Sequence, residues 1–323
     1  VQAVAAAWLM TLISNSDAMV ALVQASATLP VMVFSLVSGA VADNYNRRRV
    51  MLVAQFFMLV VALLLTLCTF LGLINAWLLL TFTFLIGCAM AFNIPAWQAS
   101  VRDMVGKDLL PAAVLLNGVG FNVTRSVAPA IGGTIVATAG VVIAFLINAI
   151  SYFGLIAALW FWSGPPDKLE RNRERLGSAI GSGLRYVSLS PQLMRICARG
   201  FAFGLTTVVV LALLPLVARD LLQGNSLTFG LLLGAFGIGA VVGGLTSSKL
   251  AEYLNNEQMV RLAFAALASA AGLCSVSGFV PLTMLAVGLG GWAWVLALAL
   301  FNTSVQLSAP RWVVGRALSL YQM

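Results

Sequence analysis

One apolar stretch of the sequence carries a charge near its middle, at Arg125. The stretch starts near residue 114, so Arg125 lies about 12 residues, or about 18 Å of helix, inside it. Gly118, Asn122, Pro129 and Gly132 recur with Arg125 at helical spacing, which places small and polar side chains on one face. A cation inside a membrane usually faces a cavity or a partner group. Two interpretations stay open: Arg125 binds an anionic or polar substrate group, or it ties helices together through backbone carbonyls.

Other polar side chains within apolar stretches are candidates for contacts with a substrate. They are Asn93, Gln98 and Gln24. Each of them also fits a purely structural hydrogen bond. We expect the substrate cavity to be lined by Arg125, Asn122, Asn93 and Gln24.

The residue types argue against an enzyme, a metal site or a bound cofactor. The sequence has no histidine, which removes Ser-His-Asp catalysis and histidine-ligated metals. The four cysteines lie in apolar stretches without the spacing of metal ligands: Cys68, Cys88, Cys197 and Cys274. A lipid-modifying membrane enzyme would need clustered acids or a nucleophile–base pair, and neither is present.

A second motif is the segment GAVADNYNRRR at residues 39–49, where an apolar stretch ends. An acid at a helix C-terminus is disfavoured by about 0.3–1 kcal/mol, so we expect a nearby cation to offset the negative charge of Asp43. Arg47 follows four residues later and would pair with Asp43 if the helix continued for another turn. Gly39 would allow another helix to approach closely. The alternative is a plain basic anchor, which explains the arginines alone.

The composition explains why these residues must be positioned by membrane helices. Of the 323 residues, 61% are hydrophobic and 9% charged, and the mean hydropathy is +1.00. A soluble domain carries about 25% charged residues. The net charge of +8 has no helix-face stripe or interleaved aromatic residues of the kind that bind nucleic acid, so we expect no nucleic-acid partner.

Runs of roughly 20 apolar residues predict about ten membrane helices. We place them at 1–15, 18–42, 50–74, 77–99, 114–138, 140–163, 193–218, 227–250, 259–279 and 281–304. The first run is too short to cross a bilayer completely. The fold class is therefore an all-α membrane bundle.

The basic residues predict the orientation of this bundle. Sixteen of the 18 lysines and arginines lie in loops on one side, Arg219 lies on the other, and Arg125 lies within a span. Cytoplasmic loops carry the excess of lysine and arginine. We therefore expect a multi-pass membrane protein with a cytoplasmic N-terminus and a cytoplasmic central linker.

Residues 164–192 form the longest connection and divide the chain. Leu176, Ile180, Leu184 and Val187 recur there at helical spacing, which predicts a short helix on the cytoplasmic interface. A merely solvated tether is the alternative. We expect an N-terminal six-helix bundle at 1–163, with a partial first helix, and a C-terminal bundle at 193–323.

The two parts repeat each other. A shift of 209 positions puts Phe92-Asn93 on Phe301-Asn302, Arg102 on Arg311, and Asn46 on Asn255, without a gap. Duplicated bundles with a binding site between the halves are a common transporter design. The same shift predicts a 6+6 protein, of which this chain holds about ten helices, so that half of the first helix and helices eleven and twelve lie outside it.

The segment after the second helix resembles the loop signature of the major facilitator superfamily. Gly39, Asp43, Arg47 and Arg48 match the signature, and Asn46 stands where glycine is usual. The resemblance implies that these four residues form a conformational latch, which grips the start of helix eleven when the transporter is open outward.

A second resemblance concerns Pro129, Gly132 and Gly133. They are similar to the end of the antiporter signature of exporters, with Ala128 replacing its usual glycine. Ordinary packing of a kinked helix is the alternative. Longer segments resemble the bacterial branch of enterobactin exporters and transmembrane secretion effectors: AWLMTL, ALVQASATLP, AFNIPAWQASV, LNGVGFNVTRSVAPAIGG and VQLSAPRWVVGRALSLYQ.

These resemblances imply a secondary active exporter of a small amphipathic or anionic organic molecule, of drug or siderophore type. Alternating access, proton antiport and a monomer in the lipid bilayer of a bacterial cytoplasmic (inner) membrane are expected with it. Nutrient uptake by symport or uniport on the same fold is the first alternative, and an inactive fragment is the second.

Overall fold

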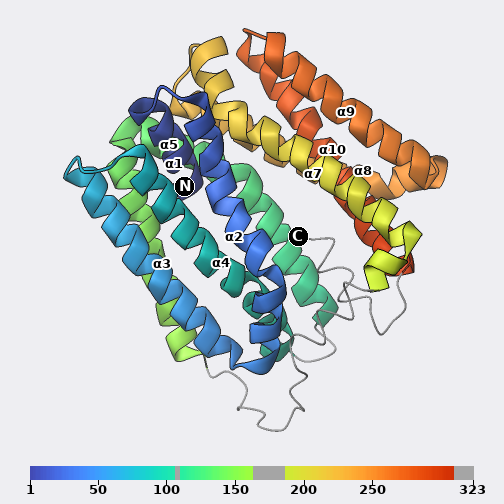
Figure 1. Ribbon diagram of the computed structural model, residues 1–323, viewed down its shortest axis with the longest axis horizontal. Helices are drawn as coiled ribbons and strands as arrows, with labels where there is room; N and C mark the ends of the chain where they lie inside the picture. Colours follow the sequence, from blue (N-terminus) through green and yellow to red (C-terminus); the bar gives the residue numbers. More distant parts are fainter. Residues whose placement is uncertain (106–109, 163–185, 309–323) are drawn as a thin grey trace.

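The computed structural model describes residues 1–105, 110–162 and 186–308, and every regular element in these ranges is helical. Eight of the described helices are long and apolar enough to cross a membrane. The helices are α1 (Gln2–Ile13), α2 (Asp17–Asn44), α3 (Arg47–Phe70), α4 (Ala76–Met104), α5 (Leu110–Phe161), α7 (Pro191–Leu216), η2 (Val217–Leu221), α8 (Ser226–Tyr253), α9 (Asn256–Val276) and α10 (Val280–Ser308) (Figure 1).

Polar caps fix where several of these helices begin. The side chains of Asn46 and Asn75 accept hydrogen bonds from the backbone amides of Arg49 and Leu78, at the starts of α3 and α4. Asn225 and Asn255 head capping boxes at α8 and α9. Such caps satisfy amides that a membrane helix leaves without partners at its N-terminus. The connection between α3 and α4 is residues 71–75, which is longer than the gap between the predicted spans 50–74 and 77–99, because α3 already ends at Phe70.

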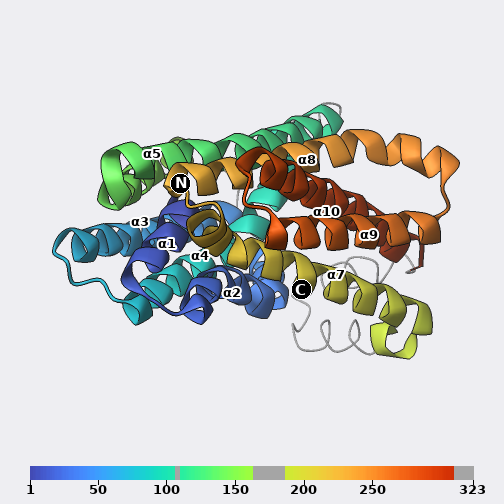
Figure 2. The ribbon, with the colours of Figure 1, turned by 90° about the horizontal axis from the view of Figure 1, so that it is seen from above.

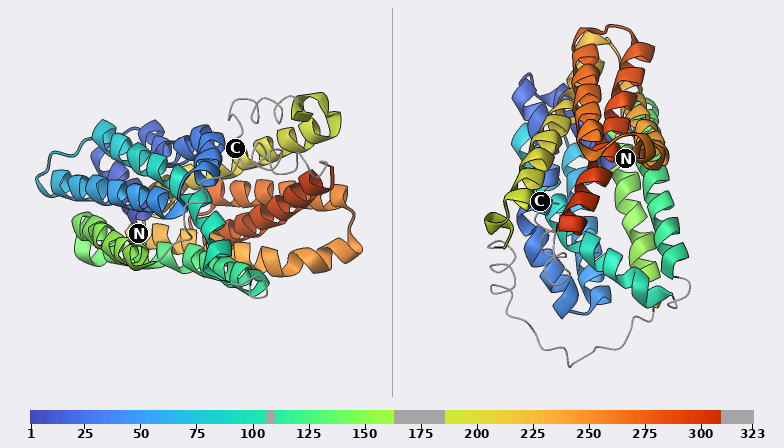
Figure 3. Two further views of the ribbon diagram at one scale, coloured as in Figure 1. Left: turned by 90° about the horizontal axis from the view of Figure 1, so that it is seen from below. Right: turned by 90° about the vertical axis from the view of Figure 1, so that its right-hand side faces the viewer.

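Helix α5 is a hairpin of two spans rather than one long helix. Its 52 residues would measure about 78 Å if straight, which is more than twice the thickness of a bilayer core. The backbone leaves the helical region at Gly140, with φ 85° and ψ 170°. Figure 3 (right) shows the two arms side by side. The break lies where the sequence predicts the turn between spans 114–138 and 140–163.

The helix boundaries carry the repeat that the sequence predicts. Asp17 and Ser226, which begin α2 and α8, are 209 positions apart, and so are Asn44 and Tyr253, which end them. Helices α3 and α9 also begin 209 positions apart, after the equivalent caps Asn46 and Asn255. The two halves are thus pseudo-symmetric in structure as well as in sequence.

The described parts of the two halves lie next to each other (Figures 2 and 3). Helices α1 to α5 form the first half, and α7 to α10 the second. We call the end of the bundle that holds Arg47 and Arg48 the basic end, and the end that holds Asp17 and Arg219 the opposite end. Helices α2 and α7 meet at the opposite end and diverge toward the basic end (Figure 1).

Helix α1 is short and lies between the halves. Its 12 residues measure about 18 Å, so it crosses only part of a bilayer, as predicted. Ala5, Ala6 and Met10 are fully buried in the core of the first half. Val4 packs instead against second-half residues, including Leu214 and Phe229. One helix therefore contributes to two cores.

The outer faces of the bundle expose large apolar side chains. Val53, Phe56 and Leu285 are 71%, 61% and 74% exposed. Water would disfavour such a surface at about 25 cal/mol per Å², whereas lipid solvates it. The exposed residues therefore mark faces that lie against acyl chains.

Several predictions fall on segments that the structure does not describe. Most of the linker at 164–192, with its predicted interfacial helix, lies outside the described residues, and the domain boundaries at 163 and 193 stay predictions. Val187 is described: it is buried against Leu193 and Val305. The observed helices α2, α4 and α10 extend two to five residues beyond the predicted spans, because their ends continue past the apolar run.

The hairpin makes Gly140 intolerant of side chains. Its backbone conformation is populated almost only by glycine, and other residues there cost about 1–3 kcal/mol. We expect Gly140→Val to lower the melting temperature of the purified protein. Gly154→Ala is the matched control, because Gly154 is helical with open space beside it. Equal melting temperatures for both variants would contradict a glycine-dependent turn.

Candidate functional site: the interface between the two halves

The backbones of α5 and α8 touch at a pair of glycines. A Cβ atom placed on Gly133 would lie 2.9 Å from the Cα of Gly230 and 2.5 Å from the carbonyl oxygen of Ser226. A Cβ on Gly230 would lie 2.7 Å from the carbonyl oxygen of Pro129. No side chain fits at either position. The two helices, one from each half, therefore pack directly backbone to backbone.

The contact continues along both helices. A Cβ on Gly234, one turn beyond Gly230, would lie 3.2 Å from the carbonyl oxygen of Ser126. Small residues at four-residue spacing thus form the α8 face, and α5 meets it with Ser126, Pro129 and Gly133. Figure 2 shows these two helices side by side. Small residues on both sides let the two backbones approach this closely.

Gly132 brings a third helix to the same place. A Cβ on Gly132 would lie 3.0 Å from the Cα of Val1 and 3.5 Å from the Cβ of Val4. Helix α1 therefore packs on α5 beside the crossing with α8. Gly132 and Gly133 therefore pack closely between the halves, a position that could not be seen from the sequence, while the antiporter-like role of Pro129, Gly132 and Gly133 stays a prediction.

Two later glycines of α8 face a neighbour in their own half. Gly239 and Gly243 lie against Gly288 and Trp292 of α10, and a Cβ on Gly243 would lie 2.6 Å from the carbonyl oxygen of Trp292. The Trp292 indole also donates to the hydroxyl of Thr246 at 2.9 Å. Helix α8 is thus held firmly by α10 and touches the first half through its early glycines.

The glycine crossing lies toward the opposite end of the bundle. Gly133 is seven residues, or about 10 Å, from the turn at Gly140, and Gly230 is close to the start of α8. The halves are therefore joined nearer to the opposite end than to the basic end. Figure 1 agrees, because α2 and α7 diverge toward the basic end.

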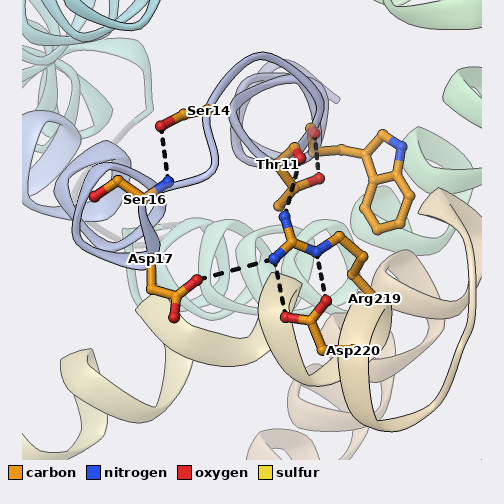
Figure 4. A network of polar contacts seen from close by, with 7 residues as sticks. Thr11, Ser14, Ser16, Asp17, Arg219 and Asp220 are labelled. Atoms are coloured by element: carbon orange, nitrogen blue, oxygen red, sulfur yellow. Dashed lines mark hydrogen bonds and ion pairs between the residues drawn. The ribbon is translucent and has the colours of Figure 1, made fainter.

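A polar network joins the halves at the opposite end itself (Figure 4). Arg219 donates from Nη1 to the backbone carbonyl of Thr11 at 3.0 Å. It binds Asp220 through Nε and Nη2 at 2.6 and 2.9 Å, and Nη2 lies 3.9 Å from Asp17. Thr11 and Asp17 belong to the first half, and Arg219 and Asp220 to the second. Sequence reasoning had used Arg219 only as the one basic residue on that side.

The described cavity candidates lie apart from this network. Asn93 of α4 accepts a hydrogen bond from Nε2 of Gln55 on α3 at 3.3 Å. Gln24 is half-buried on α2, where its backbone carbonyl accepts from Thr28. The side chains of Arg125 and Asn122 lie outside the described residues, although their backbone belongs to α5. Their roles stay predictions.

Gln55 was missed by sequence reasoning. It is 6% exposed, and its Oε1 is buried without a hydrogen-bond partner among the described residues. An orphaned buried acceptor costs about 1–3 kcal/mol. The signal was available, because Gln55 interrupts an apolar run between Val50 and Leu65.

The proposed latch residues differ in part from expectation. Helix α2 ends at Asn44 and Arg47 opens α3, so Asp43 and Arg47 do not share a continuous helix and the condition for a helical pairing is not met. Among the described residues, no atom lies within 4 Å of a Cβ placed on Gly39, so the close approach that a glycine permits is not used there by the described helices. The side chain of Asp43 lies outside the described residues.

The arginines of the segment bind carbonyls at the basic end. Arg47 donates to the carbonyl of Ala99 on α4 at 2.9 Å. Arg48 donates to the carbonyls of Leu159 and Trp160 at 2.8 and 2.6 Å, in the last turn of α5. Carbonyls in the last turn of a helix lack helical donors, and a cation there also offsets the helix dipole. These contacts hold three helices of the first half together.

Comparisons with known proteins agree with this architecture. A family model described as transmembrane secretion effector matches residues 1–323. Enterobactin exporters EntS from Escherichia coli and from Shigella boydii are each 28% identical over 297 residues, which cover 88% of this chain and 68% of each exporter.

Solved structures show the same fold at low sequence identity. A mutant of the nucleoside transporter NupG matches with a TM-score of 0.80 at 11% identity, over 99% of this chain and 82% of that one. The D-xylose-proton symporter matches with a TM-score of 0.70 at 12% identity, over 99% of this chain and 82% of that one.

The glycine crossing predicts a strong effect of a single side chain. We expect Gly230→Leu to abolish transport and to lower the melting temperature, because the new side chain meets the backbone of α5. The measurements are flux in cells or vesicles and thermal unfolding of the purified protein. Gly244→Ala, whose Cβ would meet only a side-chain atom of Val295 at 3.8 Å, should retain both properties. Normal flux in Gly230→Leu would contradict a functional crossing.

Proposed function

The chain belongs to the transmembrane secretion effector family of the major facilitator superfamily, and on that premise we propose that it is a secondary active exporter of a small amphipathic or anionic organic molecule. Proton antiport would drive the export. The observation that carries the mechanism is the glycine crossing, where two repeated halves meet backbone to backbone. Such a joint supports alternating access, in which one half tilts against the other around a central site.

The direction of transport is proposed from the relatives. The curated relatives are named as exporters of enterobactin. We propose that this chain likewise moves its substrate outward, with Arg125, Asn122, Asn93 and Gln24 lining the path. Asn93 supports this role in part, because Gln55 engages its Oδ1 and leaves the amide nitrogen as a donor for a substrate acceptor.

The placement in the membrane follows from charge. The described arginines at the basic end include Arg47, Arg48, Arg195 and Arg199, whereas Arg219 lies at the opposite end. We propose that the basic end faces the cytoplasm of a bacterium, since cytoplasmic loops carry the excess of basic residues. In the present structure the halves are then joined nearer to the outer side.

Cysteine labelling tests this orientation. In a background without Cys68, Cys88, Cys197 and Cys274, Leu73→Cys should react with an impermeant thiol reagent added outside intact cells. Leu73 is 61% exposed and lies between α3 and α4 at the opposite end. Tyr253→Cys, at an 84% exposed position at the end of α8, should react only after the cells are opened. The reverse pattern would overturn the orientation.

Substrate flux tests the function and the role of Arg125. We expect inverted vesicles containing the protein to accumulate an anionic siderophore or drug when a proton gradient is applied, and to stop when it is dissipated. Movement of the substrate out of the inverted vesicles would favour a symporter, and no flux would favour an inactive chain.

Arg125→Lys should retain part of the flux and Arg125→Ala should lose it if a point charge binds the substrate. A fork that ties helices would instead make both variants less stable.

A further inference from the structure

Arg219 of the second half binds the backbone of the first half at the opposite end. We propose that Arg219 is a gate residue, which keeps this end closed by capping α1 and must release Thr11 before the halves separate there. The inference rests on the proposed alternating access, and it names the contact that one step of that cycle breaks. Figure 4 shows the contacts on which it depends.

The acceptor is a carbonyl that α1 cannot satisfy by itself. Helix α1 ends at Ile13, and the carbonyl of Met10 already accepts the amide of Ser14. The carbonyl of Thr11 lies in the last turn, where helical donors run out. Arg219 supplies the missing donor from a position 208 residues away in the chain, and the C-terminal end of a helix also attracts its positive charge.

The guanidinium keeps a partner when the gate opens. Asp220 belongs to the same half as Arg219 and binds it with two hydrogen bonds, so this pair moves as a unit. Asp17, at 3.9 Å and with a side chain that is 72% exposed, adds a weaker attraction from the first half. Because Arg219 remains paired after it leaves Thr11, breaking the contact between the halves leaves no unpaired charge. The gate is therefore weak enough to open in every cycle.

The backbone around Arg219 is built to present it across the interface. The end of α7 widens into the π-helix η2, Val217–Leu221, and such turns are uncommon and often functional. Ala218 is fully buried in the cluster that includes Val4 of α1. After η2 the chain turns through Gln223, which has a φ of 50° and donates to the carbonyl of Asp220 at 2.7 Å. Arg219 is thus positioned by buried packing on one side and a tight turn on the other.

Spin-label distances across the opposite end test the gate. The labels are placed at Leu73→Cys in the first half and Val276→Cys in the second, in the full chain with its native cysteines replaced and reconstituted in lipid. Both positions are exposed and lie outside the network. We expect Arg219→Ala to raise the ratio of long to short distances by about tenfold or more, as the loss of one charge-assisted hydrogen bond between the halves implies. Arg219→Gln, which keeps a neutral donor, should shift the ratio less in the same direction.

Two control variants separate a gate from a local structural role. Asp220→Asn removes only a contact within the second half, so it should change the ratio less than twofold. Arg199→Ala removes a charge from α7 together with its 2.7 Å ion pair to Glu257 within the second half, and should leave the distances unchanged. The proposal is overturned if the two Arg219 variants leave the distances unchanged, or if Asp220→Asn shifts them as much as Arg219→Ala does.

Flux measured on the same samples separates the gate from the proposed function. Longer distances in Arg219→Ala, together with no flux in the unmutated chain, would support the gate and overturn the exporter. Unchanged distances, together with normal proton-driven export, would overturn the gate and leave the exporter supported.

Discussion

The contact between Gly133 and Gly230 is the constraint on which the arrangement of the two halves depends. At this point two helices from different halves approach until their backbones touch, and a single Cβ on either side would collide with main-chain atoms. Lipid offers no hydrophobic force that would drive helices together, so close backbone packing is a main source of their association. The crossing sets how close the two halves lie. Helix α1 packs beside it, and Arg219 spans the remaining gap to the carbonyl of Thr11.

The described arginines that bind backbone carbonyls make two kinds of contact, within one half and between the halves. At the basic end Arg47 and Arg48 bind carbonyls of α4 and α5, which are all in the first half. At the opposite end Arg219 binds a carbonyl of α1, which is in the other half. The chemistry is the same in both places, since an arginine satisfies carbonyls at or near the end of a helix. The contacts of Arg47 and Arg48 hold the first half together. The contact of Arg219 connects the two halves through a single hydrogen bond.

Helix α1 contacts both halves of the bundle. It is too short to span the bilayer, yet its side chains belong to the cores of both halves and its last turn receives Arg219. Its other neighbour is Gly132, beside the glycine crossing. A movement of one half against the other must therefore either carry α1 with the first half or break its packing with the second. The contacts of Ala5, Ala6 and Met10 favour the first course, because they bury more of α1 against the first half.

The sequence by itself determined the membrane class, the positions of the spans and the repeat, because hydropathy and helix caps are local properties. Asn46 and Asn255 cap equivalent helices, in agreement with their alignment, and the turn at Gly140 falls at the start of the predicted span 140–163. Only the tertiary structure decided which helices meet. Gly133 and Gly39 are both glycines in apolar helices, but Gly133 touches another helix, whereas no described residue lies within 4 Å of a Cβ placed on Gly39. In the sequence, Arg219 is the one basic residue on the side opposite to the basic loops. In the structure it links the two halves, because it binds the backbone carbonyl of Thr11, which is distant in sequence. A carbonyl carries no side-chain signature, and so no reading of residue types could have found that contact.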